Sequence, residues 1–240
     1  DVSYGWQMLE RAFADCATAY GYRELRTPYL ENTALFKRSI GEVTDIVEKE
    51  MYTFLDRNNE SITLRPEGTA SCVRACIEHG LLREGVQKLW YTGPMFRYEK
   101  PQKGRYRQFQ QLGLEVFGAE GVGIELEMIA FLVRFWKTLG LAHTLTLQIN
   151  TLGTIAERSD YRDILVAYFK QHEAALDEDS LKRLTRNPLR ILDSKNPDMQ
   201  DLINNAPQLI DSLTDESRAH FEAFCDGLDA LNIAYQINPR

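Results

Sequence analysis

The sequence predicts an α/β fold of the α+β kind, in which helices flank a mixed, mainly antiparallel sheet and a helical domain is attached. Three observations predict it. Apolar and polar residues alternate at 88–92, 95–98 and 107–117, as in the strands of a hairpin. Helical stripes of apolar residues stand before and after that hairpin. From about Ala156 the sequence becomes charged and helical, with prolines as breaks.

The elements before the hairpin follow in chain order. Apolar residues at helical spacing over 6–20 stop at Gly21, which predicts a first helix. An extended segment is predicted over 22–29, and a small hairpin over 51–55 and 61–64. A further helix is predicted from Thr69 to a stop at Gly80.

Beyond the main hairpin, a helix over about 124–139 is expected to close at Gly140, and alternation over 145–149 predicts a returning strand. A chain of 240 residues with 44% hydrophobic content is long enough for a main core and a satellite domain. The predicted domains are residues 1–155 as the main α/β domain, 156–230 as a helical insertion, and 231–240 as a return toward the main domain.

The loop between the two main strands concentrates positive charge. Residues 96–109 contain five Lys and Arg against one Glu, which gives +4, whereas the whole chain carries a formal charge of −7. This contrast predicts a local phosphate-binding device rather than a general nucleic-acid surface. Arg97 and Glu99, two residues apart on one strand, are expected to project from the same face and to form a pair that presents the guanidinium to a phosphate.

The second strand predicts a binding surface. Its alternation assigns Phe109, Gln111, Gly113 and Glu115 to one face, and Gln110, Leu112, Leu114 and Val116 to the other. Gly113 is expected to leave room for a ligand between Gln111 and Glu115. Phe109 offers an aromatic plane for a purine. Taken without the arginines, the same pattern also suits an ordinary half-exposed strand.

The cysteines are sparse and lie in apolar patterns, so Cys16, Cys72, Cys76 and Cys225 are interpreted as reduced core thiols. Cys72, Cys76 and His79 share one helix face, but no fourth ligand is near in sequence, and no metal site made of protein side chains alone is predicted. The sequence has no apolar run of about 18 residues and no targeting segment at its start. We therefore expect a cytoplasmic protein without a membrane span.

A family resemblance rests on several segments in one order. Residues 96–99 read Phe-Arg-Tyr-Glu, a basic loop follows, and residues 105–109 read Arg-Tyr-Arg-Gln-Phe. This arrangement resembles motif 2 of the class II aminoacyl-tRNA synthetases. The remaining matching segments narrow the resemblance to the histidyl-tRNA synthetase family of the bacterial type, and they are residues 35–38, 40–42, 47–54, 64–70, 104–111 and 187–195.

The resemblance implies a class II catalytic core with motifs 1 and 2, and an enzyme that activates L-histidine with ATP and Mg²⁺ for transfer to tRNA(His). It implies a homodimer formed through the first helix and strand, and a helical insertion that touches the tRNA acceptor arm. For ATP, it implies that Arg97 holds the α-phosphate and the histidine carboxylate region, Glu99 orients the nucleotide, Arg105 reaches the outer phosphates and Phe109 stacks on adenine.

The same resemblance implies a histidine site and a tRNA contact. Glu67, Gly68 and Thr69 form the turn that receives the amino group, with Gln111 beside it and Glu115 facing the imidazole. Lys100, Gln102 and Lys103 would meet the acceptor arm. No protein nucleophile is required, because the amino-acid carboxylate attacks the α-phosphorus and the site aligns the reactants and neutralises charge.

Departures from the family pattern define the alternatives. The chain ends before the expected motif 3 arginine and anticodon-binding domain, so the sequence is expected to be a catalytic-domain fragment that is impaired alone. Tyr98 and Gln110 stand where many relatives have His. Two other interpretations stay open: a non-catalytic regulatory paralogue of histidine biosynthesis, and a purely structural or dimerising fragment.

Overall fold

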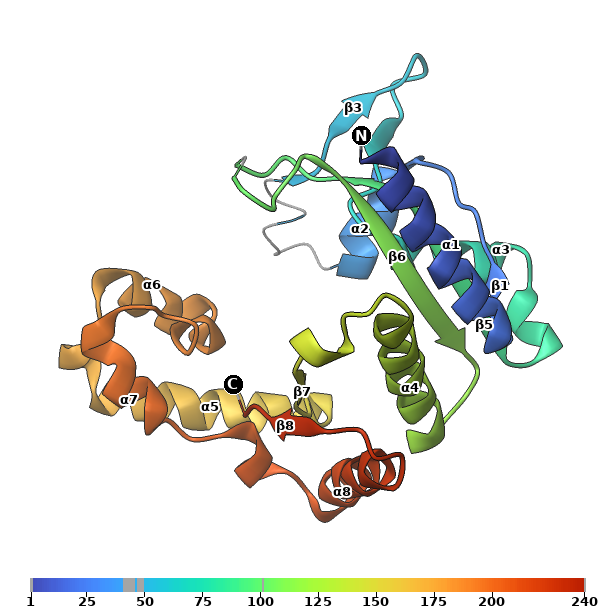
Figure 1. Ribbon diagram of the computed structural model, residues 1–240. Helices are drawn as coiled ribbons and strands as arrows, with labels where there is room; N and C mark the ends of the chain where they lie inside the picture. The colour runs from blue at the N-terminus through green and yellow to red at the C-terminus, as the bar shows by residue number, and fades with distance from the viewer. Residues whose placement is uncertain (1, 41–45, 47–49, 101, 240) are drawn as a thin grey trace. The chain divides into compact units, whose positions relative to one another are not determined.

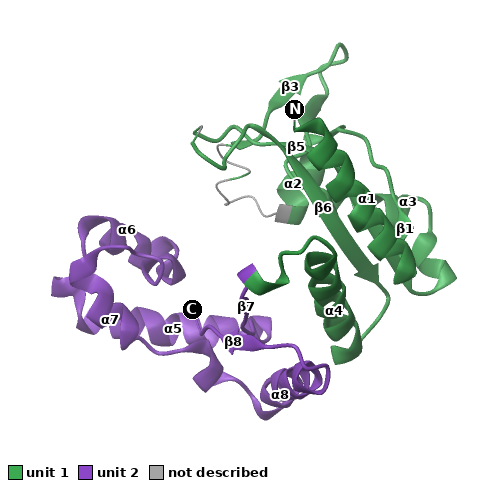
Figure 2. Ribbon diagram, viewed as in Figure 1, with its two compact units in different colours: residues 1–143 green, residues 144–240 purple. Residues whose placement is uncertain are grey.

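The computed structural model describes residues 2–40, 46, 50–100 and 102–239. Part of the quoted resemblance, at 41–42 and 47–49, and Pro101 of the basic loop lie outside the described residues. The chain forms two compact units, Asp1–His143 and Thr144–Arg240 (Figure 2). The division therefore precedes the boundary expected near residue 156.

The position of the division follows from a strand pair within the second unit. Strand β7 (Leu147–Ile149) pairs in parallel with β8 (Tyr235–Ile237). Sequence alternation had assigned the first of these strands to the main domain. Its hydrogen-bonding partner lies near the end of the chain, so β7 falls in the second compact unit.

The main sheet of the first unit has the order β1-β5-β6. Strand β1 (Arg23–Glu24) is parallel to β5 (Gln87–Phe96), and β5 pairs antiparallel with β6 (Gln108–Phe117). The predicted hairpin is therefore confirmed, although its first strand ends at Phe96 rather than Tyr98. Of the extended segment expected over 22–29, the sheet takes up Arg23 and Glu24.

One face of this sheet carries helices α1 (Ser3–Ala19) and α4 (Val122–Thr138), and Figure 1 shows α1 running along β6. The helices end at positive-φ glycines, Gly21 at 78° and Gly140 at 72°, as the sequence predicts. Apolar side chains of both helices pack against Leu112, Leu114 and Val116 on one face of β6. The buried residues of this core are Phe13, Cys16, Ala17, Tyr22, Trp90, Phe131 and Phe135.

The opposite face of the sheet packs on helix α3 (Thr69–Glu78), which ends before Gly80 at φ 64°. Cys72 of α3 is buried with Tyr91 and Met95 of β5, and Phe109 and Phe117 of β6 pack against them. The two faces of β6 therefore differ as the alternation predicts. This second face carries the residues of the predicted site.

A second small sheet has the order β2-β4-β3, all antiparallel. It contains β2 (Leu30–Asn32), β3 (Thr53–Leu55) and β4 (Ser61–Leu64), with α2 (Thr33–Ile40) beside it. The Asp56 carboxylate accepts from the backbone N–H groups of Asn58 and Glu60 at 2.8 and 2.9 Å, which closes the predicted hairpin turn.

The second unit is mainly helical around a core that includes Tyr161, Leu165, Phe169, Ile191 and Met199. Its α-helices are α5 (Ile155–Gln171), α6 (Glu178–Arg186), α7 (Gln200–Asn204) and α8 (Asp215–Ala230). Short 3₁₀ turns cover Glu173–Ala175, Pro188–Ile191, Pro197–Met199 and Leu209–Ser212, and in the first unit Leu81–Glu84, with Ala142–Thr144 at the division.

Glu157 ties the start of α5 to the start of α8. Its carboxylate accepts from the N–H groups of Thr154 and Thr214 at 2.5 and 2.6 Å and from the Ser217 hydroxyl at 2.8 Å. These hydrogen bonds hold the pKa of Glu157 far below its usual range. The Thr154-x-x-Glu157 pattern is a capping box, a signal that sequence inspection could have found.

The α/β fold class with a mainly antiparallel pattern is confirmed. Among the helices that the structure describes, none is both long enough and apolar enough to cross a membrane.

Candidate active site

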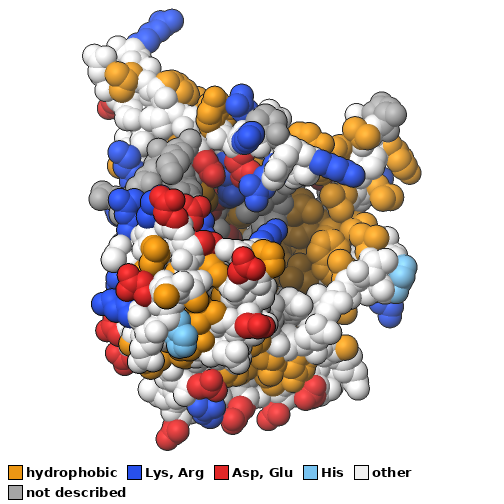
Figure 3. All heavy atoms as spheres, turned by 90° about the vertical axis from the view of Figure 1, so that its left-hand side faces the viewer, with side chains coloured by type: hydrophobic (Ala, Val, Ile, Leu, Met, Phe, Trp, Pro, Cys, Tyr) orange, Lys and Arg blue, Asp and Glu red, His pale blue; other side chains and the backbone are white. Residues whose placement is uncertain are grey.

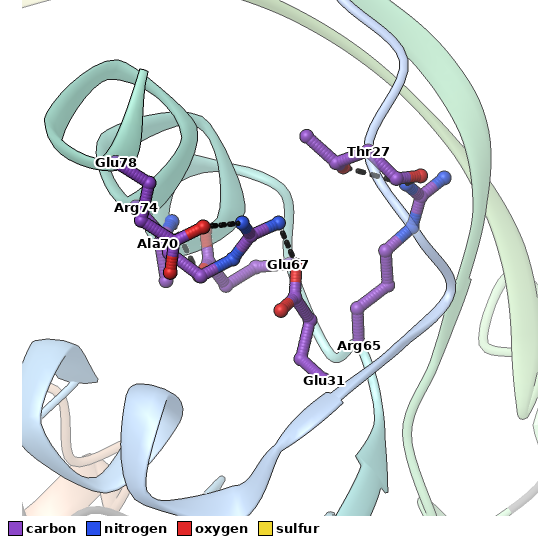
Figure 4. A network of polar contacts seen from close by, with 7 residues as sticks. All are labelled: Thr27, Glu31, Arg65, Glu67, Ala70, Arg74 and Glu78. Atoms are coloured by element: carbon purple, nitrogen blue, oxygen red, sulfur yellow. Dashed lines mark hydrogen bonds and ion pairs between the residues drawn. The ribbon is translucent and has the colours of Figure 1, made fainter. Parts of the chain in front are cut away.

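The site is built on the turn that enters α3. The Glu67 carboxylate accepts from the backbone N–H groups of Thr69 and Ala70 at 2.5 and 3.0 Å, and Figure 4 shows it folded back onto the helix start. These donors are among those that a helix leaves unsatisfied at its N-terminus. The turn therefore holds Glu67 in a fixed orientation, and its carboxylate oxygens keep lone pairs for a ligand.

The turn is joined to β6 through Thr69. Its hydroxyl donates to Glu115 Oε1 at 2.6 Å across 46 residues of sequence. Burial raises the pKa of the Glu115 carboxyl; the Thr69 hydrogen bond opposes that rise, and the nearby Glu67 charge adds to it. The structure thus brings together Glu67, Gly68, Thr69 and Glu115, which the sequence assigned to one site.

The ring of Tyr91 fills the space over Gly113. Tyr91 is the cross-strand partner of Gly113, and a Cβ added to that glycine would lie 2.2 Å from the ring. A Cβ on Gly68 would lie 2.4 Å from the same ring. Because Tyr91 is 4% exposed, this region is core rather than open. The prediction that Gly113 leaves room for a ligand is therefore wrong.

Gln111 lies opposite Gly93 on the same face of the sheet. Its Oε1 atom is buried and has no hydrogen-bond partner among the residues that the structure describes. A buried amide oxygen without a partner costs free energy, on the order of 1–3 kcal/mol, unless a ligand or water supplies a donor. A ligand that brings an N–H or O–H group to this oxygen would remove that cost.

Sequence inspection did not single out Arg65, a buried residue that contacts β5 beside this site. Its Nε donates to the Pro94 carbonyl at 3.1 Å, and its Nη1 donates to the carbonyl and hydroxyl of Thr27 at 3.0 Å each (Figure 4). Its guanidinium carbon lies 4.6 Å from the centre of the Tyr29 ring. Arg65 is 2% exposed, and burial lowers its pKa. This cation joins β5 to the segment that follows β1.

A second arginine fixes α3. Arg74 donates to the buried Glu31 carboxylate of β2 at 2.8 Å and to Glu78 at 2.6 Å (Figure 4). The Glu31 side chain is only 7% exposed, so its charge needs this partner. Neither residue was singled out in the sequence, because a distant ion pair leaves no local pattern.

Arg97 lies just beyond the end of β5, near the start of α3. Its Nε donates to the Pro66 carbonyl at 2.9 Å, and its guanidinium carbon lies 5.2 Å from the centre of the Phe109 ring. Among the described residues, no carboxylate pairs with its terminal nitrogens. Arg97 is thus fixed at one nitrogen, and its terminal nitrogens are available for an anion.

The expected pairing of Arg97 with Glu99 requires correction. Because β5 ends at Phe96, neither residue continues the strand alternation. Glu99 lies instead 3.5 Å from Arg105 Nε as an ion pair. Its Oε2 atom is buried and lacks a hydrogen bond among the described residues. In this arrangement Glu99 holds Arg105, whose side chain is 63% exposed at the mouth of the hairpin.

The loop itself is exposed, and its tip is closed by backbone hydrogen bonds between Gln102 and Arg105, with Gly104 at φ 82°. Lys100, Gln102 and Lys103 all lie at the surface. Figure 3 shows basic and acidic side chains interspersed with hydrophobic ones over the face that it draws.

The two cysteine thiols of α3 lie in the core. Cys72 and Cys76 are buried, and burial raises the pKa of Cys72 to about 12, so the group is a neutral thiol at physiological pH. Within residues 2–40, 46, 50–100 and 102–239, no three His, Cys, Asp or Glu side chains are grouped as metal ligands.

Comparisons with known proteins match this chain over nearly its whole length. Residues 5–237 match the family described as histidyl-tRNA synthetase. A histidine–tRNA ligase of Legionella pneumophila subsp. pneumophila strain Philadelphia 1 is 63% identical over 98% of this chain and 55% of its own length. The relative from strain Lens is 62% identical over all of this chain and 56% of its own length. The chain thus spans about half the length of the curated relatives it matches.

Solved structures agree with this assignment. The apo histidyl-tRNA synthetase of S. aureus has a TM-score of 0.75 and 38% identity, over 99% of this chain and 54% of that one. A Bacillus halodurans protein, titled an ATP phosphoribosyltransferase regulatory subunit/histidyl-tRNA synthetase, has a TM-score of 0.61 over 96% of this chain and 62% of that one. At 18% identity this second likeness shows the fold alone. On the family match and the end-to-end similarity, the chain belongs to the histidyl-tRNA synthetase family.

Proposed function

We propose that the full-length protein carrying this chain is a histidine–tRNA ligase, an enzyme that activates L-histidine with ATP and transfers the histidyl group to tRNA(His). One observation carries the proposal. The start of α3, which carries the acceptors of Glu67 and Thr69, packs over the face of β6 that carries Gln111 and Glu115, and the guanidinium of Arg97 lies just beyond the end of β5. Acceptors suit the N–H groups of histidine, and the cation suits phosphate.

The acceptors divide between the two ends of histidine. Glu67, Thr69 and Gln111 would receive the α-ammonium group, whose three protons match three acceptor groups. Glu115 would accept the ring N–H of a neutral imidazole. An amino acid without that N–H would leave the carboxylate buried and unpaired, which costs more than a missing methylene does.

The phosphate end would use the basic hairpin. Arg97 would hold the α-phosphate, Glu99 would orient the nucleotide, Arg105 would reach the outer phosphates, and Phe109 would stack on adenine. Lys100, Gln102 and Lys103 would meet the acceptor arm, and Mg²⁺ would arrive with ATP. Arg105 has to leave Glu99, 3.5 Å away, to reach a phosphate, and its exposure allows that movement.

The chemistry needs alignment rather than a protein nucleophile. A carboxylate oxygen of histidine attacks the α-phosphorus of ATP, the bond to the bridging oxygen breaks, and pyrophosphate leaves with that electron pair. The terminal ribose hydroxyl of the tRNA then attacks the histidyl carbonyl, its proton passes to the departing phosphate, and AMP leaves with the electron pair of the broken acyl–oxygen bond. Arg97 would stabilise the charge on the α-phosphate as it develops in the first step.

The domain and partner proposals extend beyond this site. Residues 156–230 would act as the insertion that touches the tRNA acceptor arm, with 1–155 as the catalytic core and 231–240 returning to it. The full-length protein would be a cytoplasmic homodimer through the α1–β1 region. Light scattering at micromolar concentration should give the dimer mass; a monomer alone would contradict the dimer.

Histidine-dependent ATP–pyrophosphate exchange tests the proposed activity on the full-length protein, with the isolated 1–240 chain measured in parallel. We expect exchange from the full-length protein and a reduced rate or none from the isolated chain. Omission of histidine, and its replacement by an amino acid without a side-chain N–H, provide the controls. Exchange that ignores histidine, or no exchange by the full-length protein, would reject the proposal and favour the regulatory paralogue or a structural role.

A further inference from the structure

Arg65 and Pro66 connect β4 to the turn before α3, and they lie against the end of β5. The carbonyl of Arg65 accepts from the backbone N–H of Phe96 at 3.0 Å, and the carbonyl of Pro66 accepts from Arg97 Nε at 2.9 Å. Phe96 is the last residue of β5, and Arg97 follows it directly. Two successive carbonyls therefore fix both the backbone before Arg97 and one nitrogen of its guanidinium.

The side chain of Arg65 holds the same strand end. Its Nε donates to the Pro94 carbonyl of β5, and its Nη1 donates to the carbonyl and the hydroxyl of Thr27. A buried guanidinium is stable only where acceptors surround it, so these contacts define one position for the side chain. Arg65 thus holds β5 at Pro94 through its side chain and at Phe96 through its backbone carbonyl.

Gly93 allows the guanidinium to reach the strand. A Cβ added to Gly93 would lie 2.6 Å from Arg65 Nη2, which is too close for any side chain at that position. Arg65 therefore lies directly against the backbone of β5. Because the contact is with the backbone, a change at Arg65 should displace the strand end that leads to Arg97 rather than a single flexible side chain.

We propose that Arg65 is a positioning residue for the adenylation step: by fixing the end of β5 and the Pro66 carbonyl, it orients the guanidinium of Arg97 toward the α-phosphate. This inference rests on the proposed function. Arg65 is 2% exposed, so it acts through Arg97 rather than by contact with ATP. Glu67 is held separately, by backbone N–H groups at the start of α3, so histidine binding should depend much less on Arg65.

The test uses Arg65→Lys in the full-length protein, because lysine keeps the charge but cannot reach Pro94 and Thr27 with a single nitrogen. Single-turnover adenylate formation at saturating substrates should slow about ten- to 100-fold, as a small misplacement of an aligned group predicts. The KM for histidine should stay within threefold. Arg134→Lys is the control: this arginine also lies over a tyrosine ring, that of Tyr20, at 5.7 Å, but in α4 on the other face of the sheet, and its replacement should leave the rate within twofold.

The same substitution in an Arg97→Ala protein identifies the route. If Arg65 acts through Arg97, Arg65→Lys should slow the Arg97→Ala protein less than threefold, since the group that it positions is already absent. Equal slowing in both backgrounds, or an unchanged rate in the otherwise unmodified protein, would overturn the inference alone. Unmodified full-length protein without histidine-dependent exchange would overturn the proposed function and this inference with it.

A milder variant decides the question if Arg65→Lys does not fold. Thr27→Val keeps the shape of the side chain and removes the hydroxyl that accepts from Arg65. Thr53→Val is its control, because the Thr53 hydroxyl bonds to Thr63 at 2.9 Å within the small sheet. In that case we expect Thr27→Val to slow adenylate formation about three- to tenfold, as loss of one hydrogen bond predicts, and to have little effect in the Arg97→Ala protein. Thr53→Val should leave the rate within twofold. No slowing by Thr27→Val, or equal slowing in both backgrounds, would then reject the role of Arg65.

Discussion

Glu115→Gln is the substitution that most directly tests how the site selects its ligand. The Glu115 carboxylate is partly buried, accepts from Thr69 at 2.6 Å, and carries a pKa raised mainly by burial. Glutamine keeps the size and one acceptor oxygen but removes the charge. A hydrogen bond to a charged group contributes about 1.5–3 kcal/mol. At about 1.4 kcal/mol for each factor of ten, the KM for histidine should rise roughly ten- to 150-fold.

ATP binding should be affected much less. Glu115 lies opposite Leu89 in the hairpin, and Arg97 follows Phe96 at the other end of β5. Seven steps along a strand, from 89 to 96, correspond to about 23 Å. Pyrophosphate exchange at varied histidine and varied ATP gives both constants. Glu120→Gln, at an exposed position just after β6, provides the charge-matched control.

Thermal unfolding separates ligand recognition from structural support. Because the folded-state pKa of Glu115 lies above 4.5, the folded protein binds the proton more tightly than the unfolded chain does. The ionised carboxylate therefore costs stability at neutral pH, and this cost vanishes as the pH falls below 4.5. Glu115→Gln should raise Tm at pH 8 and show no gain at pH 4. A lower Tm at pH 8 together with equal increases of both KM values would refute the proposed role of Glu115 in histidine recognition. Unchanged kinetics would mean that Glu115 does not contact the ligand.

Two further predictions concern Arg97 and Glu157. Arg97→Ala in the full-length protein should slow adenylate formation by several hundredfold, about 3–4 kcal/mol of transition-state stabilisation. Arg83→Ala, at the exposed turn after α3, is the control and should leave the rate unchanged. A loss below tenfold in single-turnover kinetics would contradict the role of Arg97 at the α-phosphate. Glu157 has a folded-state pKa below its ordinary 4.5, so its stabilisation is complete above pH 4.5 and is lost as the pH falls through the folded value. Glu157→Gln should lower the Tm at pH 7 and flatten the decline of the Tm on acidification. Glu178→Gln, at an 86% exposed side chain, should behave as the unmodified chain does. A parallel decline of the Tm in both variants would contradict the proposed role of Glu157.

Much of the fold follows from local pattern. Alternation along β6 assigned Leu112, Leu114 and Val116 to one face and Phe109 to the other. The structure agrees, and it packs the first set with α1 and α4. The stops at Gly21, Gly80 and Gly140 were predictable because each requires only a positive φ at the end of a helix. The sequence also brought Glu67, Thr69 and Glu115 into one site, but through a family resemblance rather than through physical derivation.

The tertiary structure decided what depends on distant partners. The domain division follows β7, whose partner β8 lies near the end of the chain, and period-two alternation does not identify a partner. Arg65 and the Arg74–Glu31 pair join separate segments and leave no periodic signal.

Gly113 shows most clearly which part of the packing the sequence pattern does not predict. Sequence alone determined that this position on β6 lacks a side chain, from which open space seemed to follow. Only the hairpin register, which sets Tyr91 opposite Gly113 and beneath Gly68, decided that an aromatic ring occupies that space. The physical reason is that packing depends on which side chains meet across the sheet, and that register is fixed by tertiary structure.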